Sequence, residues 1–339
     1  MATPSMNRPT PERIFGTLTA FQGSAALKAA IELDIFTAIA DGATTTAAIA
    51  QKASAAERGV RILCDYLTIQ GFLTKERGSY GLTQESAVFL SKRSPAYMGS
   101  IANFLAHERS IATYQRLTES VRKGGTVTGD GSNTAPDDLW WVTFAKSMAP
   151  LTGIAAAFIA DLAGAGEGKP MKVLDVAASH GMFGITIAKK NPQAQIVALD
   201  WPNVLQVTKE NADAAGVGNR LTLLAGSAFD VELGSGYDAV LFTNLFHHFD
   251  YAGCEKLMKR AHAALKPGGK VFTLEFVPNE NRISPPMAAA FSLIMLANTD
   301  AGDAYTFAEY EKMFRNSGFA KTTLHQVPDM PQQVLVSEK

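Results

Sequence analysis

The second half of the chain alternates short apolar segments with amphipathic ones, and this alternation constrains the fold more than any other feature. Seven segments have the length and boundaries of β-strands: residues 172–176, 195–199, 221–225, 239–244, 269–276, 322–325 and 333–336. Amphipathic, helix-length segments follow most of them, which predicts a parallel, doubly wound α/β sheet. Only a short link separates the last two strands, so we expect them to form an antiparallel pair at the sheet edge.

The first of these strands runs directly into a loop of small residues, 177–181, and then into a helix. Such a turn lets the backbone approach a ligand and directs helix N–H groups at it. A dinucleotide fingerprint would need Gly-x-Gly-x-x-Gly, but only Gly181 and Gly184 are present, which disfavours a nicotinamide cofactor. Asp175 precedes the loop and favours a cationic or zwitterionic ligand. The alternative is that the small residues serve only the packing of helix on strand.

The second and third strands also end in residues suited to a nucleoside. Asp200 closes the second strand about twenty residues beyond the loop, where a carboxylate can accept hydrogen bonds from both ribose hydroxyls. Its alternative role is to cap the next helix. Trp201 can cover an adenine edge or simply pack. After the third strand, Ser227 can bind the base and Phe229 can stack on it.

The fourth strand brings two adjacent histidines, His247 and His248, to the carboxyl edge of the sheet, where ligands bind in open α/β folds. We interpret His247 as a candidate base; a pocket-lining histidine without chemistry is the alternative. Adjacent histidines on a turn point apart, and no third ligand is evident. We therefore predict no metal site.

The N-terminal part of the chain is helical and then forms a hairpin. Apolar residues recur every four positions along residues 24–39 and predict a single helix there: Leu27, Ile31, Ile35 and Ile39. Two further helices, residues 44–53 and 55–71, precede a hairpin over residues 72–83. This is the order of a winged helix, a fold that often binds DNA.

Charge argues against DNA as a partner. In the third helix, Arg58 and Arg61 are offset by Glu57 and Asp65, which is too little positive charge to neutralise several phosphates. The whole chain has 31 Lys and Arg against 32 Asp and Glu, a net charge of −1. We therefore expect no nucleic-acid partner.

The sequence also suggests a compartment and a domain division. Cys64 and Cys254 lie far apart in helical segments, which favours reduced thiols and a cytoplasmic protein. Residues 1–11 lack the apolar core of a signal peptide, and no apolar run reaches the roughly 20 residues that span a bilayer, so we expect no membrane partner. We divide the chain into three parts, a winged-helix domain, a helical connector and the sheet domain: residues 1–95, 96–160 and 161–339. Within the connector we expect a polar, Gly-rich loop over residues 124–138 and a helix over residues 139–159.

These residues, together with Ala-Leu-Lys-Pro-Gly-Gly-Lys at 264–270 and the segments 30–36 and 80–83, resemble the small-molecule O-methyltransferase family of the plant-caffeate and hydroxyindole type. The resemblance covers nearly the whole chain. It implies a Rossmann-like fold, S-adenosylmethionine as cofactor, S-adenosylhomocysteine as product and a small, aromatic acceptor. It also implies that the N-terminal domain forms a homodimer, helping to build the partner's substrate pocket, instead of reading DNA.

The resemblance assigns roles to particular positions. His247 matches the catalytic base and Glu275 the carboxylate that orients it. We expect the cofactor at the carboxyl ends of the first four strands: Asp175, Ala177, Gly181, Asp200, Trp201, Ser227, Ala228, Phe229, Thr243 and Asn244. We expect a mostly apolar acceptor pocket, although its residues with helical spacing would by themselves suit a core: Phe144, Met148, Phe246, Met287, Phe291, Met295 and Asn298.

The chain departs from the family pattern at three places. The cofactor loop, Ala-Ala-Ser-His at 177–180, has fewer glycines than the family's loop. His248 stands where an Asp is usual. A second carboxylate expected near the base falls on Ala304, with Asp303 adjacent: Asp303 is the candidate to take its place, and the alternative is that Glu275 alone holds the base.

The predicted chemistry is transfer of a methyl group to a hydroxyl. A phenol has a pKa near 10, so an imidazole with a reference pKa of about 6.5 can take its proton as the methyl moves, and Glu275 would fix the imidazole tautomer. Methyl transfer to carbon, nitrogen or sulfur is the alternative within the same fold. A winged-helix regulator that binds a nucleotide-like effector is the alternative outside enzymes.

Overall fold

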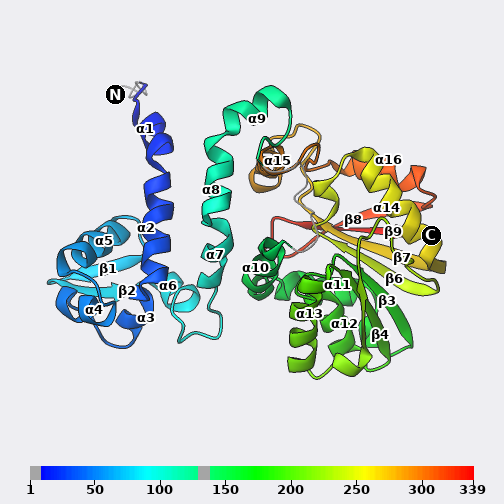
Figure 1. The fold of residues 1–339 in the computed structure, drawn as a ribbon, viewed down its shortest axis with the longest axis horizontal. Coiled ribbons are helices and arrows are strands. Elements are labelled where there is room, and N and C mark those ends of the chain that lie inside the picture. Colours follow the sequence, from blue (N-terminus) through cyan, green and yellow to red (C-terminus); the bar gives the residue numbers. More distant parts are fainter. Residues whose placement is uncertain (1–8, 129–137) are drawn as a thin grey trace, which may run out of the picture. The chain divides into compact units, whose positions relative to one another are not determined.

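The computed structural model describes residues 9–128 and 138–339, and the chain divides after His107 into two units. The first unit contains helices and one hairpin (blue to cyan in Figure 1). Its elements are α1 (Glu12–Thr19), α2 (Phe21–Glu32), α3 (Ile35–Ala40), α4 (Thr46–Lys52), α5 (Glu57–Ile69), β1 (Leu73–Glu76), β2 (Ser79–Leu82), α6 (Gln84–Phe89), η1 (Gly99–Ile101) and α7 (Ala102–Leu105).

The first unit has its own core, and one predicted helix is broken there. Ile35, Phe36 and Ile39 are buried with residues of α4, α5 and the hairpin. The single helix predicted over residues 24–39 is wrong, because α2 ends at Glu32 and Asp34 adopts a left-handed φ of 54° before α3 begins. The turn redirects α3 so that its apolar residues enter the core. The predicted hairpin is confirmed, with Leu73 paired to Leu82.

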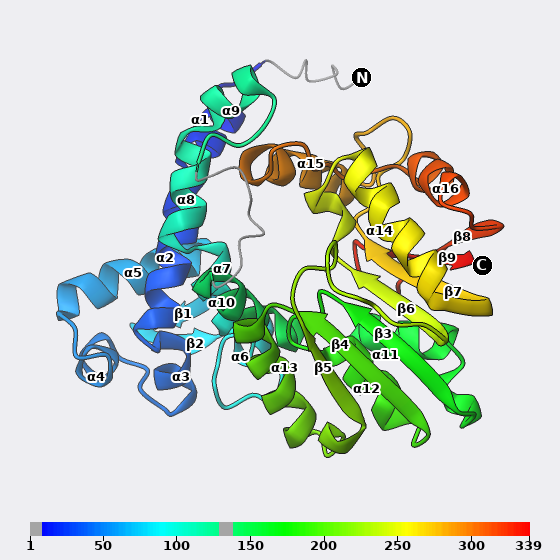
Figure 2. The same cartoon turned by 45° about the vertical axis from the view of Figure 1, so that its right-hand side comes forward.

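The second unit holds a seven-stranded sheet in the order β5-β4-β3-β6-β7-β9-β8 (Figure 2). Its strands are β3 (Met171–Val176), β4 (Ala194–Asp200), β5 (Leu221–Ala225), β6 (Tyr237–Thr243), β7 (Leu265–Glu275), β8 (Lys321–Gln326) and β9 (Gln333–Glu338). Strands β3 to β7 are parallel, whereas β9 lies between β7 and β8 and is antiparallel to both. The seven predicted strands and the antiparallel last pair are confirmed.

Helices cover both faces of this sheet. On one face, α11 and α12 pack with Val173, Ile196 and Leu241. On the other, α14 and α16 pack with Leu174 and Phe242. Strands buried on both faces need apolar residues on both sides, which is why the sequence showed continuous apolar runs instead of alternation. The helices of this unit are α8 (Glu108–Gln115), α9 (Leu117–Lys123), α10 (Leu139–Met148), η2 (Ala149–Leu151), α11 (Gly153–Leu162), η3 (Ala165–Glu167), α12 (Met182–Lys190), α13 (Pro202–Ala214), η4 (Gly218–Arg220), η5 (Phe246–His248), α14 (Tyr251–Ala264), α15 (Pro286–Asn298) and α16 (Phe307–Asn316).

The helical stretch before the sheet is bent. A helix from residue 139 to residue 159 was expected, but α10 gives way to the short η2, which contains Pro150, and α11 follows at an angle of 76°. Most of the predicted Gly-rich loop, residues 124–138, lies outside the described residues. Within the described residues no single helix is long and apolar enough to cross a membrane, and the bent pair Leu139–Leu151 and Gly153–Leu162 passes that test only together.

Candidate active site

The candidate site lies at the carboxyl ends of the parallel strands. The chain runs outward from β3 to β4 and β5 on one side and continues to β6 and β7 on the other (Figure 2). Ligands of open α/β sheets bind where the strand order reverses in this way. The predicted cofactor loop follows β3, and the histidine turn follows β6, so the fold brings them to adjacent strand ends.

The cofactor loop is built from left-handed residues without the usual glycines. Ala177 and Ser179 have φ values of 56° and 54°, and Gly181 has 72°. A Cβ at Gly181 would lie 2.5 Å from the Thr208 side chain, so this glycine is needed for packing as well as for its backbone angle. Ala and Ser adopt this conformation at a cost of about 1–2 kcal/mol each, which other contacts of the loop must offset.

His180 and Asp200 hold this loop in shape. The Nδ1 of His180 accepts a hydrogen bond from the N–H of Met182 at 3.1 Å, so the side chain caps the start of α12. Burial lowers the pKa of His180 to about 4, which keeps the ring neutral and able to accept. Asp200 accepts from the N–H of Ser179 at 2.8 Å and from that of Trp201 at 2.7 Å. The hydrogen bond of His180 therefore explains the last residue of the unusual Ala-Ala-Ser-His sequence.

Two buried carboxyl groups give this site its electrostatic character. Asp175 is fully buried; its Oδ2 accepts from the N–H of Gly184 at 3.1 Å, and its Oδ1 has no partner. The Oγ of Ser179 is also buried without a partner. Burial raises the pKa of Asp175 to about 7 and that of Asp200 to about 6. Buried polar atoms without partners are rare, and an unpaired carboxyl is best satisfied by a cationic ligand.

The remaining predicted cofactor residues lie around the same strand ends. Trp201 and Trp141 both pack against a small buried apolar cluster that contains Val204. Ser227 accepts from the N–H of Phe229 at 3.1 Å, and so orders the turn after β5 with Ala228 inside it. Thr243 is buried at the end of β6.

Asn244 and Phe229 connect these strand ends to other parts of the unit. Asn244 follows β6 in a left-handed conformation, with φ of 56°, and its side chain accepts from Gln332 at 3.3 Å. Phe229 makes an edge contact with Phe249, which follows the histidine turn. The turn after β5 therefore touches the turn that carries His247.

The histidine turn is held by a buried carboxylate. Glu275, the last residue of β7, accepts from the N–H groups of Leu245 and Phe246 at 2.9 and 2.8 Å. Its other oxygen lies 2.6 Å from Nδ1 of His247, and both side chains are buried. The pairing of Thr243 with Leu274 brings the ends of β6 and β7 to one level, which makes these three contacts possible. With Nδ1 bound to Glu275, Nε2 is the nitrogen left for proton transfer.

Aromatic rings surround His247. Phe291 of α15 makes an edge contact with it, at 4.8 Å between ring centres, and stacks on Phe276 at 4.0 Å. His248 lies on another side, in edge contact with Trp141 of α10. Burial, together with the neighbouring His247, holds the pKa of His248 well below its usual range.

Trp141 and Phe276 were not among the predicted site residues. Trp141 also makes an edge contact with Phe144, a residue predicted to line the acceptor pocket. Phe276 directly follows Glu275, and this neighbour was the only sign in the sequence that Phe276 lies near the site; it stacks on Phe291, which contacts His247. Trp141 gave no such signal, because its proximity depends on how α10 packs.

Other predicted pocket residues are distributed unequally. Phe246, predicted to line the pocket, is fully buried, and its ring packs in the core against Phe242 and Phe314. Met295 is buried on α15, whereas Met287, at the start of that helix, is exposed. Two others lie at helix ends and carry no contact that assigns them a role: Met148 at the end of α10, and Asn298, whose amide donates to the carbonyl of Ile294.

Asp303 lies in a different arrangement from the one predicted. Its carboxylate forms an ion pair with Arg282, at 3.0 Å, and accepts from the N–H of Ala304 at 2.8 Å. Its hydrogen bonds thus go to Arg282 and the backbone, and Glu275 supplies the carboxylate for His247. Among the described residues, no group of three or more His, Cys, Asp and Glu side chains is placed to hold a metal ion.

Comparison with known proteins bears on the fold and the family of this chain. Residues 160–320 match the O-methyltransferase domain, and residues 15–92 match the O-methyltransferase dimerisation domain. A crystal structure from Nostoc punctiforme, of a protein assigned as an O-methyltransferase, is 48% identical, with a TM-score of 0.93 over 98% of this chain and 100% of that one. The 3-hydroxy-5-methyl-1-naphthoate 3-O-methyltransferase of Streptomyces sahachiroi is 29% identical over 86% of this chain and 84% of its own.

The fold is also that of human N-acetylserotonin methyltransferase in complex with S-adenosylmethionine, with a TM-score of 0.85 and 21% identity over 99% of both chains. The protein belongs to the family of S-adenosylmethionine-dependent O-methyltransferases, and the resemblance noted in its sequence is confirmed.

Proposed function

We propose that this enzyme transfers the methyl group of S-adenosylmethionine to a hydroxyl of a small aromatic acceptor, with His247 as the general base. The observation that carries this proposal is the 2.6 Å contact between Nδ1 of His247 and the buried carboxylate of Glu275. A carboxylate in this position selects the tautomer with the proton on Nδ1 and stabilises the imidazolium that forms.

The cofactor supplies a methyl group on a sulfonium, and its sulfur leaves with the bonding electrons as a neutral thioether. His247 Nε2 takes the proton from the acceptor hydroxyl as the new carbon–oxygen bond forms. Glu275 keeps the ring oriented through this change, because the two backbone N–H groups fix its own position. The acceptor leaves as a methyl ether, and the proton on His247 is then lost to solvent.

Asp175 and Asp200 are suited to hold the cofactor. The unpartnered Oδ1 of Asp175 and Oγ of Ser179 provide acceptors beside the left-handed loop. Each oxygen of Asp200 already receives one backbone hydrogen bond and retains a second lone pair for a ribose hydroxyl. A cation near Asp175 offsets the burial that raises the pKa of this carboxyl.

The rings beside the base favour a flat, aromatic acceptor. Phe291 contacts His247 directly, while Trp141 and Phe144 continue the aromatic surface on α10. Such rings bind planar molecules through stacking and edge contacts. The relatives named for a naphthoate and for N-acetylserotonin act on aromatic molecules, which supports the same class of acceptor here.

The decisive experiment replaces the base. We expect His247→Gln to lower the turnover of a phenolic acceptor by about 10²-fold or more, the usual share of a general base, while S-adenosylhomocysteine still binds. His325→Gln is the matched control, because His325 lies on β8 and bonds to Thr323. Full phenol turnover by the His247 variant would contradict the base role, and product analysis showing methyl on carbon, nitrogen or sulfur would contradict the acceptor assignment.

We also infer that the enzyme is a cytoplasmic homodimer. Helices α1 and α2 expose four large apolar side chains at the start of the dimerisation domain: Ile14, Phe15, Leu18 and Phe21. A cluster of exposed apolar residues is typical of a protein interface. Cys64 and Cys254 are buried and unpaired, which suits a reducing compartment.

A further inference from the structure

The turn that carries His247 is supported by a second segment besides β7. This segment, residues 299–305, lies between α15 and α16. Gly302 packs directly on the turn, because a Cβ at this position would overlap the carbonyl oxygen of His247. Further along, the hydroxyl of the buried Tyr305 donates to the carbonyl oxygen of Phe249 at 2.6 Å. The position of the turn therefore depends on the position of this segment.

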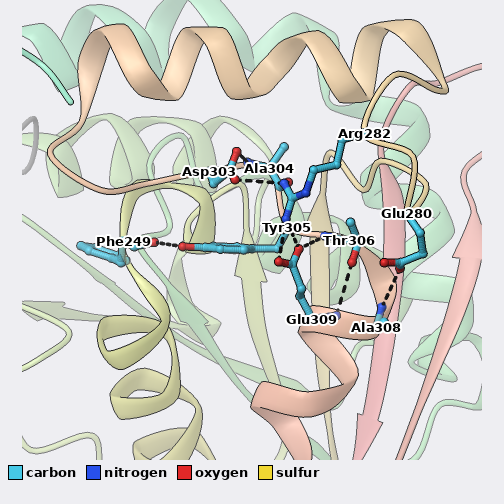
Figure 3. Close-up of polar contacts among 9 residues, drawn as sticks. All are labelled: Phe249, Glu280, Arg282, Asp303, Ala304, Tyr305, Thr306, Ala308 and Glu309. Carbon is cyan, nitrogen blue, oxygen red and sulfur yellow. Dashed lines mark hydrogen bonds and ion pairs between the residues drawn. The ribbon is translucent and has the colours of Figure 1, made fainter. Parts of the chain in front are cut away.

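Arg282 ties this segment to the stretch of chain that follows β7 (Figure 3). Its Nη1 donates to the Asp303 carboxylate at 3.0 Å and lies 3.4 Å from the carbonyl oxygen of Ala304. Its Nη2 lies 2.6 Å from both carboxylate oxygens of Glu309. Glu309 in turn accepts from the N–H of Thr306 at 2.7 Å, in the capping box that begins α16. The Arg282 guanidinium therefore contacts both the segment, at Asp303 and Ala304, and the first turn of α16, at Glu309.

The backbone around Arg282 indicates that these contacts determine its conformation. Arg282 has a φ of 56°, in the left-handed region that residues other than glycine keep only where their surroundings fix it. Glu280, two residues earlier, accepts from the N–H of Ala308 at 3.4 Å and adds a second link to α16 (Figure 3). A single exposed ion pair contributes little, but a guanidinium with two carboxylates and a carbonyl forms a network.

We propose that Arg282 is a positioning residue for the turn that carries His247, and that it acts through the segment of residues 299–305. This inference rests on the proposed role of His247 as the base. Glu275, at the end of β7, contacts the imidazole itself. Arg282, seven residues further along the chain, contacts the segment whose Gly302 packs on the backbone of the turn. Asp303, predicted to touch the base, contributes instead as a partner of Arg282.

Proton transfer makes the reaction sensitive to this support. A base must lie within hydrogen-bond reach of the hydroxyl while the oxygen is aligned with the methyl carbon. A displacement of the base by about 1 Å can cost about 10²-fold in rate, so a smaller displacement still slows the reaction measurably. An acceptor that is already ionised needs no base, so its methylation depends much less on where His247 lies.

The test compares Arg282→Met and Tyr305→Phe in the full-length enzyme. The first removes the charge at an exposed position and keeps an aliphatic chain; the second removes only the hydroxyl that contacts Phe249. Arg315→Met is the matched control, because Arg315 pairs with Glu311 on the same helix, α16, at 3.0 Å. Each protein is assayed with a phenol of pKa near 10 and with a nitrophenol that is ionised at the assay pH.

We expect both variants to lower kcat for the un-ionised phenol by about tenfold, with KM nearly unchanged and binding of S-adenosylhomocysteine intact. The ionised acceptor should lose less than about threefold, and the double variant should lose less than the product of the two single effects, because both act on one segment. The proposal is overturned if both variants behave like Arg315→Met, or if the two acceptors lose equally.

His247→Gln, assayed with the same two acceptors, separates this proposal from the proposed function. If it leaves phenol turnover intact, the base role fails and the positioning role fails with it. If it lowers phenol turnover while the Arg282 and Tyr305 variants do not, only the positioning role fails.

Discussion

Replacement of Glu275 by glutamine is the sharpest test of how this site works. The carboxylate is fully buried and accepts from two backbone N–H groups and from Nδ1 of His247. In Glu275→Gln the amide oxygen can keep both backbone bonds, so we expect the turn to stay folded. The amide NH2 then faces Nδ1, which must accept, so the imidazole carries its proton on Nε2 and cannot take one from the acceptor.

The expected loss follows from that change of tautomer and from the missing negative charge beside the imidazolium. A positioned base contributes about 10²–10⁴-fold, so we expect kcat for an un-ionised phenol to fall at least about 100-fold, or about 2.7 kcal/mol. The measurement is the initial rate of S-adenosylhomocysteine formation at saturating substrates, with a calorimetric Kd for that product as a check on the cofactor site.

Glu338→Gln is the control for this substitution, because Glu338 lies on the neighbouring strand β9 and pairs with Lys270 at 2.9 Å near the surface. A nitrophenolate acceptor should recover much of the activity of Glu275→Gln. Turnover of the un-ionised phenol within about threefold of the unchanged enzyme would refute the reasoning, since a general base is worth far more than that.

Three further predictions concern the cofactor site and the dimer. Burial raises the pKa of Asp175 to about 7, and a cationic ligand favours the ionised form of this carboxyl. Calorimetry should therefore show S-adenosylmethionine binding more weakly as pH falls from 8 to 5.5, by up to about tenfold per pH unit below 7. A Kd independent of pH would contradict this. Ala177 has a φ of 56°, so Ala177→Gly should raise the free energy of unfolding by about 0.5–1 kcal/mol. Ala178→Gly, at a buried position without positive φ, should lower the free energy of unfolding by a similar amount. Urea unfolding measures both effects, and equal effects would exclude backbone strain at Ala177. Phe15→Glu combined with Leu18→Glu should raise the dissociation constant of the proposed dimer by about a hundredfold or more, since each buried apolar side chain contributes about 1.5–3 kcal/mol. Sedimentation showing an unchanged dimer would place the interface elsewhere.

The central strands could be predicted because they are buried on both faces and therefore form continuous apolar runs in the sequence. The pairing of His247 with Glu275 followed from the family resemblance, and the structure adds the cause, since the register of Thr243 with Leu274 aligns the ends of β6 and β7. The broken helix at Asp34 was missed because the spacing of apolar residues continues across the turn.

Side-chain direction within the histidine turn was harder to predict. Phe246 and His247 are adjacent, yet on the short η5 one ring enters the core and the other contacts Phe291. Asp303 was placed by its neighbour in the sequence, but its partner is Arg282, on a different loop. Contacts between two loops leave no periodic pattern in a sequence, so neither arrangement could be read from it.

The position of β9 between β7 and β8 has a consequence for how the enzyme matures. Since β9 is the last of the sheet's strands in chain order, β7 stays an unpaired edge during synthesis until β9 has left the ribosome. Gln333 pairs with Glu275 itself, so the carboxylate that contacts His247 gains its neighbour on β9 only at that stage. Nascent chains interrupted before residue 333 would expose a long apolar edge, which makes them substrates for chaperones or for aggregation and not partly active enzymes.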